Sequence, residues 1–357
     1  MSNVWGRGIR VSIFGESHGK AIGIIIDGLP PGEDIDLDEI NFYMQKRSPG
    51  RDQLTTPRRE RDEVEILSGL FNGKTTGAPL CGMIRNSDTR SSDYNSDLPR
   101  PGTADLTAYI KYHGYNDYRG GGHFSGRLTA PLTFAGSIAR QILKRDNISI
   151  GAHILKISDV LDDRFNSISH ELLEDLTKSS FPLLNKSLEG DMKASILGAK
   201  EDSDSLGGVI ECAAIGIPPG LGSPFFDSME SSISSMMFSI PGVKAIEFGA
   251  GFDIASMRGS EANDEIYLEN GSFYTKTNHS GGINGGITNG MPIVFRLAFR
   301  PTPSIKKTQN TVNLKTMTDS EISIQGRHDP CIVPRAVVVV ESALALCILD
   351  SKLSDRW

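Results

Sequence analysis

The sequence lacks the features that mark secreted and membrane proteins. Its 357 residues include only four cysteines, which lie far apart and lack metal or redox spacing. We expect them to be small buried apolar residues in a reducing compartment. No run of about 18 apolar residues could span a membrane, and Met1-Ser2-Asn3-Val4 does not begin an apolar signal sequence. We therefore expect a cytoplasmic protein that does not bind membranes.

Excess positive charge is also missing. The 37 Lys and Arg against 44 Asp and Glu give a net charge of −7, which argues against general nucleic-acid binding. A site for an anionic ligand must then be a local concentration of basic side chains. No repeat of about 20–50 residues, low-complexity segment or clear linker divides the chain. We predict one α+β domain over residues 1–357.

Apolar periodicity predicts the main elements of this domain. The polar segment 86–117 is expected to be a long irregular connection. Expected strands cover residues 9–15, 22–26, 64–70, 80–84, 149–157, 194–199, 209–217 and 293–299. Expected helices cover residues 38–45, 128–143, 170–176, 227–238 and 336–349.

The stretch from Tyr118 to Arg127 reads Tyr-Arg-Gly-Gly-Gly-His-Phe-Ser-Gly-Arg. Glycine backbone can bend closely around a ligand and present N–H donors to it. A glycine loop that leads into a helix is a good site for a phosphate or a carboxylate. Arg119 and Arg127 would add charge to that site. The alternative is a tight turn that carries two solvated arginines.

A second basic region, residues 46–61, holds six basic and two acidic side chains. We interpret it as a loop that folds over an anionic ligand, and a solvated surface run is the equally weighted alternative. Other glycine-rich segments carry single His, Arg and Asp residues without metal-ligand spacing, so no metal is expected. This pattern favours a phosphorylated, acidic substrate and acid–base chemistry by histidine.

One motif match competes with this interpretation. Gly15-Glu-Ser-His-Gly19 fits the G-x-S-x-G pattern of serine hydrolases, with Ser17 as nucleophile. That motif requires a helix directly after the serine, whereas residues 22–26 are β-branched and favour a strand. Gly19-Lys20 also lacks the complete spacing of a phosphate-binding P-loop. We therefore give the hydrolase reading little weight.

Five segments together resemble the chorismate synthase family. They occur in the family's order and extend from residue 14 to about residue 349, so the combination is far more specific than any one of them. They are Phe14-Gly-Glu-Ser-His-Gly19, Thr55-Thr-Pro-Arg-Arg-Glu60 with Val64-Glu-Ile-Leu-Ser-Gly69, Asp117-Tyr-Arg-Gly-Gly-Gly122, Asn278-His-Ser-Gly-Gly-Ile283, and Gly326-Arg-His-Asp-Pro-Cys331 with Arg335-Ala-Val337.

The resemblance implies a β-α-β sandwich fold and a lyase of the shikimate pathway, which leads to the aromatic amino acids. The implied reaction is a 1,4-elimination that converts 5-enolpyruvylshikimate 3-phosphate to chorismate and phosphate. It requires reduced FMN without net redox change, and a separate NADPH-dependent reductase would supply the electrons. The family's usual assembly is a homotetramer.

The resemblance also implies roles for individual residues. His18 matches the histidine that protonates the reduced flavin, and Asp329 matches the aspartate that works with flavin N5 in removing the ring proton. The implied substrate-binding residues are Arg47, Arg51, Arg127 and Arg327. The implied flavin-binding residues are Ser125, Gly126, Arg127, Gly285, Arg300, Ser304, Arg327 and His328.

The chain departs from the family pattern at several of these positions. Thr103 replaces the second catalytic histidine, Gln53 replaces a loop arginine, and Pro241 replaces a flavin-pocket asparagine. Because threonine cannot act as an acid near neutral pH, we expect His123 to have taken that role, with His113 as the next candidate. In the equally weighted alternative, His123 only keeps a hydrogen-bond donor where the family has an arginine. A non-catalytic flavin- or phosphometabolite-binding relative is the alternative function.

Overall fold

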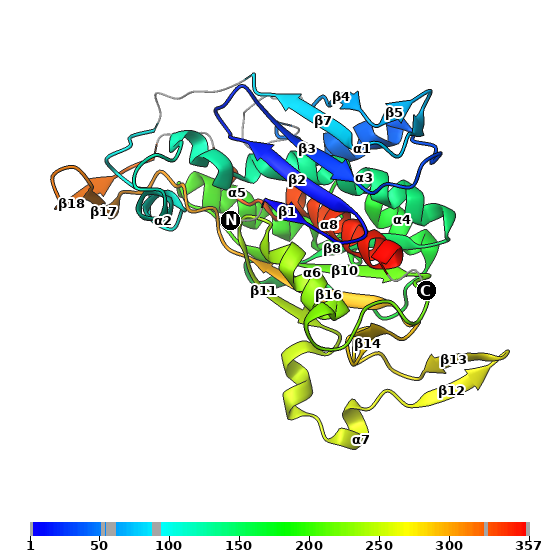
Figure 1. The fold of residues 1–357 in the computed structure, drawn as a ribbon. Helices are drawn as coiled ribbons and strands as arrows, with labels where there is room; N and C mark the ends of the chain where they lie inside the picture. Colours follow the sequence, from blue (N-terminus) through cyan, green and yellow to red (C-terminus); the bar gives the residue numbers. More distant parts are fainter. Residues whose placement is uncertain (1–2, 51–53, 55–61, 88–93, 325–327, 355–357) are drawn as a thin grey trace.

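The computed structural model describes residues 3–50, 54, 62–87, 94–324 and 328–354. Two five-stranded antiparallel sheets enclose a layer of helices (Figure 1). The first sheet has the order β1 (Val4–Trp5), β2 (Arg10–Gly15), β3 (Ala21–Asp27), β7 (Leu80–Arg85) and β4 (Glu65–Ser68). The second has the order β11 (Val243–Phe248), β16 (Ile293–Phe299), β10 (Gly208–Ile215), β8 (Ser149–Ile157) and β9 (Val160–Leu161).

The enclosed layer consists of α1 (Leu37–Arg47), α3 (Thr129–Arg145) and α8 (Val333–Ser354). α3 packs along α8 and against β3, while α8 covers β8 and β10. Both helices are buried on nearly all sides, as expected for helices between two sheets. α3 and α8 can approach closely because Gly136 has no side chain: a Cβ there would lie 2.3 Å from the Cβ of Ser342.

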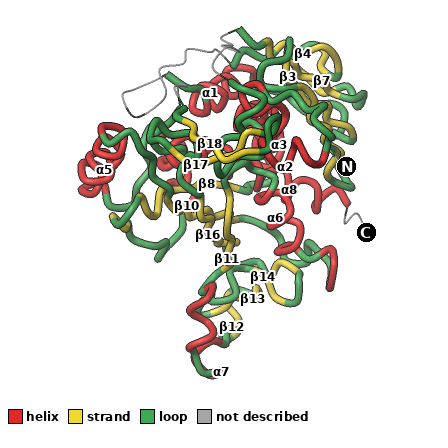
Figure 2. Tube along the Cα trace, turned by 90° about the vertical axis from the view of Figure 1, so that its left-hand side faces the viewer, coloured by secondary structure: helices red, strands yellow, loops and turns green. Residues whose placement is uncertain are grey.

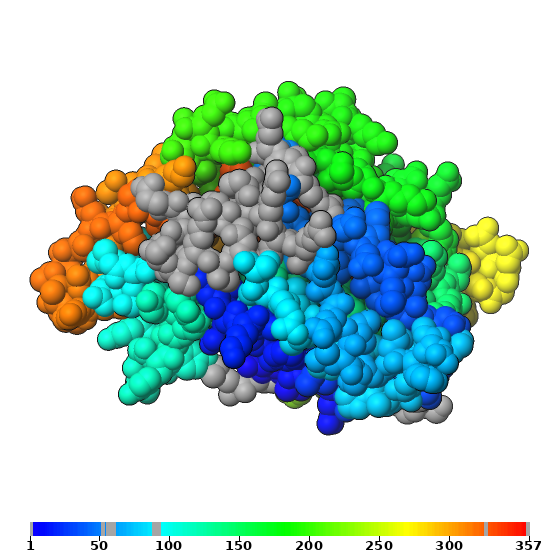
Figure 3. Space-filling model, turned by 90° about the horizontal axis from the view of Figure 1, so that it is seen from above, coloured from blue at the N-terminus to red at the C-terminus, as the bar shows by residue number. Residues whose placement is uncertain are grey.

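The remaining elements surround this core. On its flanks are α4 (His170–Lys178), α5 (Glu189–Glu201), α6 (Met229–Phe238), and the short strands β5 (Leu70–Phe71) and β6 (Lys74–Thr75). α2 (Asp105–Lys111) and the hairpin of β17 (Gln309–Asn313) and β18 (Thr318–Ile322) lie at one end of the molecule. The opposite end carries the hairpin of β12 (Ile266–Glu269) and β13 (Ser272–Thr275), yellow in Figure 3, and α7 (Gly259–Ala262) precedes this hairpin.

The end that carries α7, β12 and β13 forms an arm that projects from the body of the protein (Figure 2). A small hairpin of β14 (Ile283–Asn284) and β15 (Ile287–Thr288) lies at its base. Large apolar side chains on this arm and the segment leading to it are exposed, among them Phe252 at 82% and Phe273 at 77%. Such a concentration of exposed apolar groups is typical of a surface that another protein covers.

The structure confirms the predicted β-α-β sandwich and most elements, and it corrects two expectations. Residues 194–199 are not a strand but part of α5, in which Met192 and Ile196 are buried one helical turn apart. Segment 86–117 is not wholly irregular, because it contains α2. In the described part of the chain, no helix combines the length and apolarity needed to cross a membrane.

Candidate active site

The glycine stretch forms a tight turn, Arg119–Phe124, and a second short turn, Gly126–Leu128, joins it to α3. Gly120, Gly121 and Gly122 all have positive φ, at 60°, 82° and 53°, a conformation that only glycine adopts without strain. A Cβ on Gly120 would lie 2.5 Å from Cδ2 of His18. The glycines therefore let this turn pack directly on the His18 loop, and Ser17 N donates to Gly122 O at 3.0 Å.

His18 lies behind the glycine turn and is 9% exposed. Its ring meets Tyr94 edge to face, with ring centroids 5.3 Å apart. The neighbouring Ser17 is 1% exposed and is followed by β3 rather than by a helix. Ser17 thus lacks the exposed strand-to-helix turn that a hydrolase nucleophile requires, and the serine hydrolase interpretation is wrong.

A cavity of about 930 Å³ opens beside the glycine turn, between β2, α6 and the segment after β16. Its wall contains six of the residues expected to bind flavin or to supply the acid: His123, Ser125, Gly126, Arg300, Ser304 and His328. Arg100, Thr103 and Pro241 also line it. Two other expected flavin-binding residues that the structure describes do not line this cavity. Arg127 lines a second, smaller cavity, and Gly285 lies in the turn between β14 and β15.

A smaller cavity of about 230 Å³ adjoins the first one. The two share Ser125, Gly126 and His328 in their walls. Among the described residues, three arginines line the smaller cavity, Arg47, Arg127 and Arg335, against one acidic residue, Asp329. The fold therefore brings together residues from α1, the start of α3 and the start of α8.

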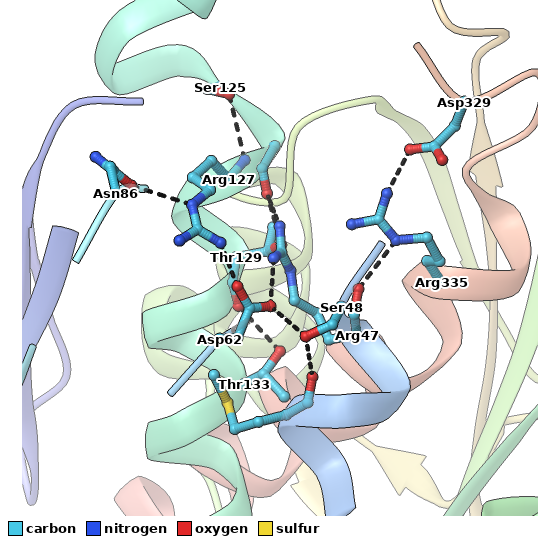
Figure 4. Close-up of polar contacts among 12 residues, drawn as sticks. Arg47, Ser48, Asp62, Asn86, Ser125, Arg127, Thr129, Thr133, Asp329 and Arg335 are labelled. Carbon is cyan, nitrogen blue, oxygen red and sulfur yellow. Dashed lines mark hydrogen bonds and ion pairs between the residues drawn. The ribbon is translucent and has the colours of Figure 1, made fainter. Parts of the chain in front are cut away.

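Arg47 and Arg127 are held by one carboxylate, that of Asp62 (Figure 4). Arg47 Nη1 lies 2.7 Å from Asp62 Oδ2, and Arg127 Nη1 pairs with Oδ1. Burial disfavours the ionised form of Asp62, yet the charges and hydrogen bonds of the two arginines lower the pKa of Asp62 to about 2. The three groups are thus all charged at neutral pH and carry a net positive charge.

Each arginine of this cluster has further anchors. Arg47 Nε donates to Thr129 Oγ1 at 3.2 Å, and its Nη2 donates to Gly126 O at 3.0 Å. Arg127 Nε donates to Asn86 Oδ1 at 3.2 Å. At 4% exposure Arg47 is not a solvated surface residue, so the surface alternative is wrong for this position. Arg51, Gln53 and Arg327 lie outside the described residues.

Asp329 lies just before α8 and faces Arg335 in the first turn of that helix (Figure 4). Arg335 Nη1 is 2.5 Å from Asp329 Oδ2, and Arg335 Nε donates to the backbone oxygen of Arg47 at 2.9 Å. Burial lowers the pKa of Arg335, which nevertheless stays charged because arginine starts from so high a value. Arg335 lies inside one of the segments that resemble the family, and Asp62 directly follows the basic region 46–61. Neither was predicted as a site residue.

The two histidines proposed as replacement acids differ in position. His123 reaches the wall of the larger cavity, where its Nδ1 is 2.7 Å from Gly15 O and its Nε2 is 3.2 Å from Asn3 Oδ1. His113 is exposed and does not line either cavity. Thr103 has a local structural task, since its Oγ1 accepts from Asp105 N at 3.1 Å as α2 begins.

A β-α-β sandwich with a glycine turn and buried arginines around two adjoining cavities defines a protein that handles anionic small molecules. Comparison with known proteins is consistent with this class. The family model for chorismate synthase matches residues 9–353. The chain belongs to the chorismate synthase family.

Individual relatives match over almost the whole chain. A chorismate synthase of Korarchaeum cryptofilum is 48% identical over 98% of this chain and 96% of its own length. One from Methanobrevibacter smithii is 44% identical over 100% of this chain and 98% of its own length. A crystal structure of chorismate synthase superposes with a TM-score of 0.76 at 30% identity, covering 98% of this chain and 93% of the other.

Proposed function

We propose that the protein is a chorismate synthase, a lyase that converts 5-enolpyruvylshikimate 3-phosphate to chorismate and phosphate. In this reaction a ring proton leaves and the electron pair of its C–H bond joins the double bonds of the ring. The electron pair of the C–O bond departs with phosphate, so there is no net redox change. The observation that carries the proposal is the smaller cavity, where Asp329 faces a surplus of arginines. The family match over residues 9–353 does not favour a non-catalytic relative.

The smaller cavity is the proposed substrate site. Its substrate carries one phosphate and two carboxylates, and guanidinium groups bind such anions strongly through paired hydrogen bonds. Arg47 and Arg127 supply the charge within the described residues, and we propose Arg51 and Arg327 as further ligands. Asp329 is the proposed acceptor of the ring proton.

The larger cavity is the proposed site for reduced FMN. Its residues fit such a group, because no atom from elsewhere in the described chain lies within 4 Å of a Cβ built on Gly126. A ligand can therefore approach the backbone there. Ser125, Arg300, Ser304 and His328 would hold the flavin from that wall, with His18 behind the glycine turn as the proposed proton donor. When bound, reduced FMN would supply an electron transiently to assist phosphate departure.

Three further properties belong to the same proposal. We propose that a separate NADPH-dependent reductase reduces the flavin, that the enzyme works in the cytoplasm, and that it forms a homotetramer. The exposed apolar side chains of the arm, including Ile266 and Phe273, support self-association. Analytical ultracentrifugation of the purified chain tests the proposed homotetramer, and a monomer at assay concentration would contradict it.

We also propose Gly285 as a flavin contact, although it lies outside both described cavities.

The decisive experiment measures phosphate release from 5-enolpyruvylshikimate 3-phosphate under nitrogen. Dithionite-reduced FMN should support turnover, whereas oxidised FMN alone should not. The dependence on reductant distinguishes this reaction from a contaminating phosphatase, and chorismate formation should match phosphate release mole for mole. Full activity in aerobic buffer without a reductant would contradict the proposed cofactor. Flavin binding without any turnover would favour the non-catalytic alternative.

The proposed acid for phosphate departure is His123, which reaches the larger cavity where Thr103 offers no acid. The substitution His123→Gln keeps hydrogen bonding but removes the acid. It should lower kcat by about 10²-fold and remove one ionisation from the pH profile, with FMN affinity unchanged. If His123→Gln keeps near-normal kcat while His123→Ala loses it, His123 is only a hydrogen-bond donor to Gly15 and the acid lies elsewhere.

A further inference from the structure

Among the described arginines in the wall of the smaller cavity, Arg335 is the one to which neither the motifs nor the proposed chemistry gives a task. Its side chain spans two partners: Nη1 lies 2.5 Å from Asp329 Oδ2, and Nε donates to Arg47 O at 2.9 Å (Figure 4). The two contacts use different edges of the guanidinium group. Together they fix its plane relative to both the carboxylate and the end of α1.

The position of Arg335 in the fold makes it a rigid support. It lies in the first turn of α8, where Arg335 N bonds to Ile332 O at 3.1 Å. α8 is buried along most of its length between the two sheets, and side chains on packed helices hold a geometry better than those on loops. Asp329, by contrast, lies in the segment that precedes the helix. The helix thus reaches back to the carboxylate through Arg335.

We propose that Arg335 is a positioning residue that orients the carboxylate of Asp329 toward the ring proton of the substrate. This inference rests on the proposed function, in which Asp329 accepts that proton. Small displacements of a catalytic group are costly, since misplacing it by about 1 Å can slow a reaction about 10²-fold. An ion pair anchored on a buried helix prevents such displacement.

The same geometry separates Arg335 from the substrate-binding arginines. The side-chain bonds of Arg47 to Asp62, Thr129 and Gly126 O do not involve the side chain of Arg335. Loss of the Arg335 side chain should therefore leave the anion site intact while releasing Asp329. The expected signature is a fall in kcat with little change in KM, because only the orientation of the proton acceptor is lost.

The test compares Arg335→Met, Arg335→Lys and a control, Arg140→Met, in the anaerobic phosphate-release assay. Arg140 is a comparably buried arginine that pairs with Glu341 at 3.1 Å in the helix layer and lines neither cavity. Arg335→Met should lower kcat about 10²-fold, with substrate KM and FMN affinity within about twofold. Arg335→Lys, which keeps a cation near Asp329, should recover at least part of that loss. Arg140→Met should lose stability and keep kcat.

Two additional variants separate the failure of this inference from failure of the proposed function. The proposed function fails if the wild-type protein releases no phosphate with reduced FMN. If Asp329→Asn retains full activity, the proposed function stands, but Asp329 is not the proton acceptor and the positioning role of Arg335 fails. If Asp329→Asn is inactive but Arg335→Met is normal, only the positioning role fails. It also fails if Arg335→Met raises KM without lowering kcat, since Arg335 would then bind substrate directly.

Adding Arg335→Met to Asp329→Asn should cause no further loss of residual activity, and an additional large loss would overturn the inference. Should Arg335→Met not fold, Arg335→Lys gives the same kcat and KM comparison.

Discussion

Two clusters of buried charges lie in different parts of the molecule and serve different ends. The pocket cluster, Arg47, Asp62 and Arg127, lies beside the smaller cavity. The sheet cluster, His153, Asp162, Glu211 and Arg296, lies on the second sheet. All seven residues are buried, so burial of charge does not by itself distinguish a site from a structural network.

The difference lies in what satisfies the carboxylates. In the sheet cluster, Asp162 accepts from Leu184 N at 2.8 Å and from Asn185 N at 2.9 Å, and Glu211 accepts from Phe165 N at 2.8 Å. These bonds tie neighbouring loops to the sheet. In the pocket cluster, two guanidinium groups share one carboxylate, and the positive charge that remains borders a cavity. A surplus of one sign at a cavity marks a ligand site, whereas charges saturated by backbone mark a structural one.

The largest expected effect is a loss of protein stability when the sheet cluster loses Arg296. Arg296 pairs with Glu211 at 3.3 Å and Glu247 at 2.6 Å, and its Nη2 donates to Gly249 O at 2.8 Å. Arg296→Met removes the cation that Glu211 and Glu247 share, so two carboxylates lose a charged partner and Glu211 is left with its bonds to His153 and Phe165 N. This change should cost about 3–5 kcal/mol of unfolding free energy. Urea unfolding measures this loss, and KM of the remaining folded enzyme should not change. A changed KM with normal stability would contradict the structural assignment.

Arg47→Ala should have its main effect on KM rather than on the stability of the protein. Loss of the guanidinium group removes a charged contact to the anionic substrate, which should cost about 2–4 kcal/mol and raise KM strongly. FMN affinity should be nearly unchanged. Stability should fall less than in Arg296→Met, because Asp62 still pairs with Arg127. Steady-state kinetics with a parallel flavin titration checks this prediction. An unchanged KM would mean that Arg47 does not contact the substrate and that the pocket cluster, like the sheet cluster, has only a structural role.

The helices beside the smaller cavity could be predicted where the sequence has a clear local apolar pattern. The helices at 128–143 and 336–349 could be predicted because their apolar residues recur along runs longer than a strand, and α3 and α8 confirm them. The run at 194–199 was misassigned because six apolar or small residues fit either element. Only the tertiary burial of Met192 and Ile196 decides for α5.

Ion-pair partners could not be predicted in this way. Asp62 is 15 residues from Arg47 and 65 from Arg127, and nothing in the sequence distinguishes it from the other acidic residues near the basic run. The same holds for Arg335, whose bond to the backbone of Arg47 joins positions 288 apart. Motif positions identified which residues meet at the cavities, but the packing of α1, α3 and α8 decides which charges neutralise one another.

The smallest expected effect is a difference between the two clusters in how their contribution to stability depends on pH. Burial opposes protonation of His153, but its hydrogen bonds to Asp162 and Glu211 and their charges raise the pKa of His153 above its ordinary value of 6.5. A raised pKa in the folded state means that the native protein binds the proton more tightly than the unfolded chain. The stabilisation is therefore complete below about pH 6.5 and is lost as pH rises through the raised value.

The substitution His153→Gln isolates this contribution, since other titrating groups are common to both proteins. The difference in unfolding free energy between wild type and His153→Gln should be largest near pH 6 and should shrink toward pH 8. In Asp62→Asn the corresponding difference should stay constant over this range, because the pKa of Asp62 is about 2 and the carboxylate remains ionised throughout. Urea unfolding at several pH values provides both comparisons. If the cost of His153→Gln does not vary with pH, His153 does not bind its proton more tightly in the folded protein. The sheet cluster then holds a neutral histidine beside carboxylates that Arg296 and backbone N–H groups satisfy.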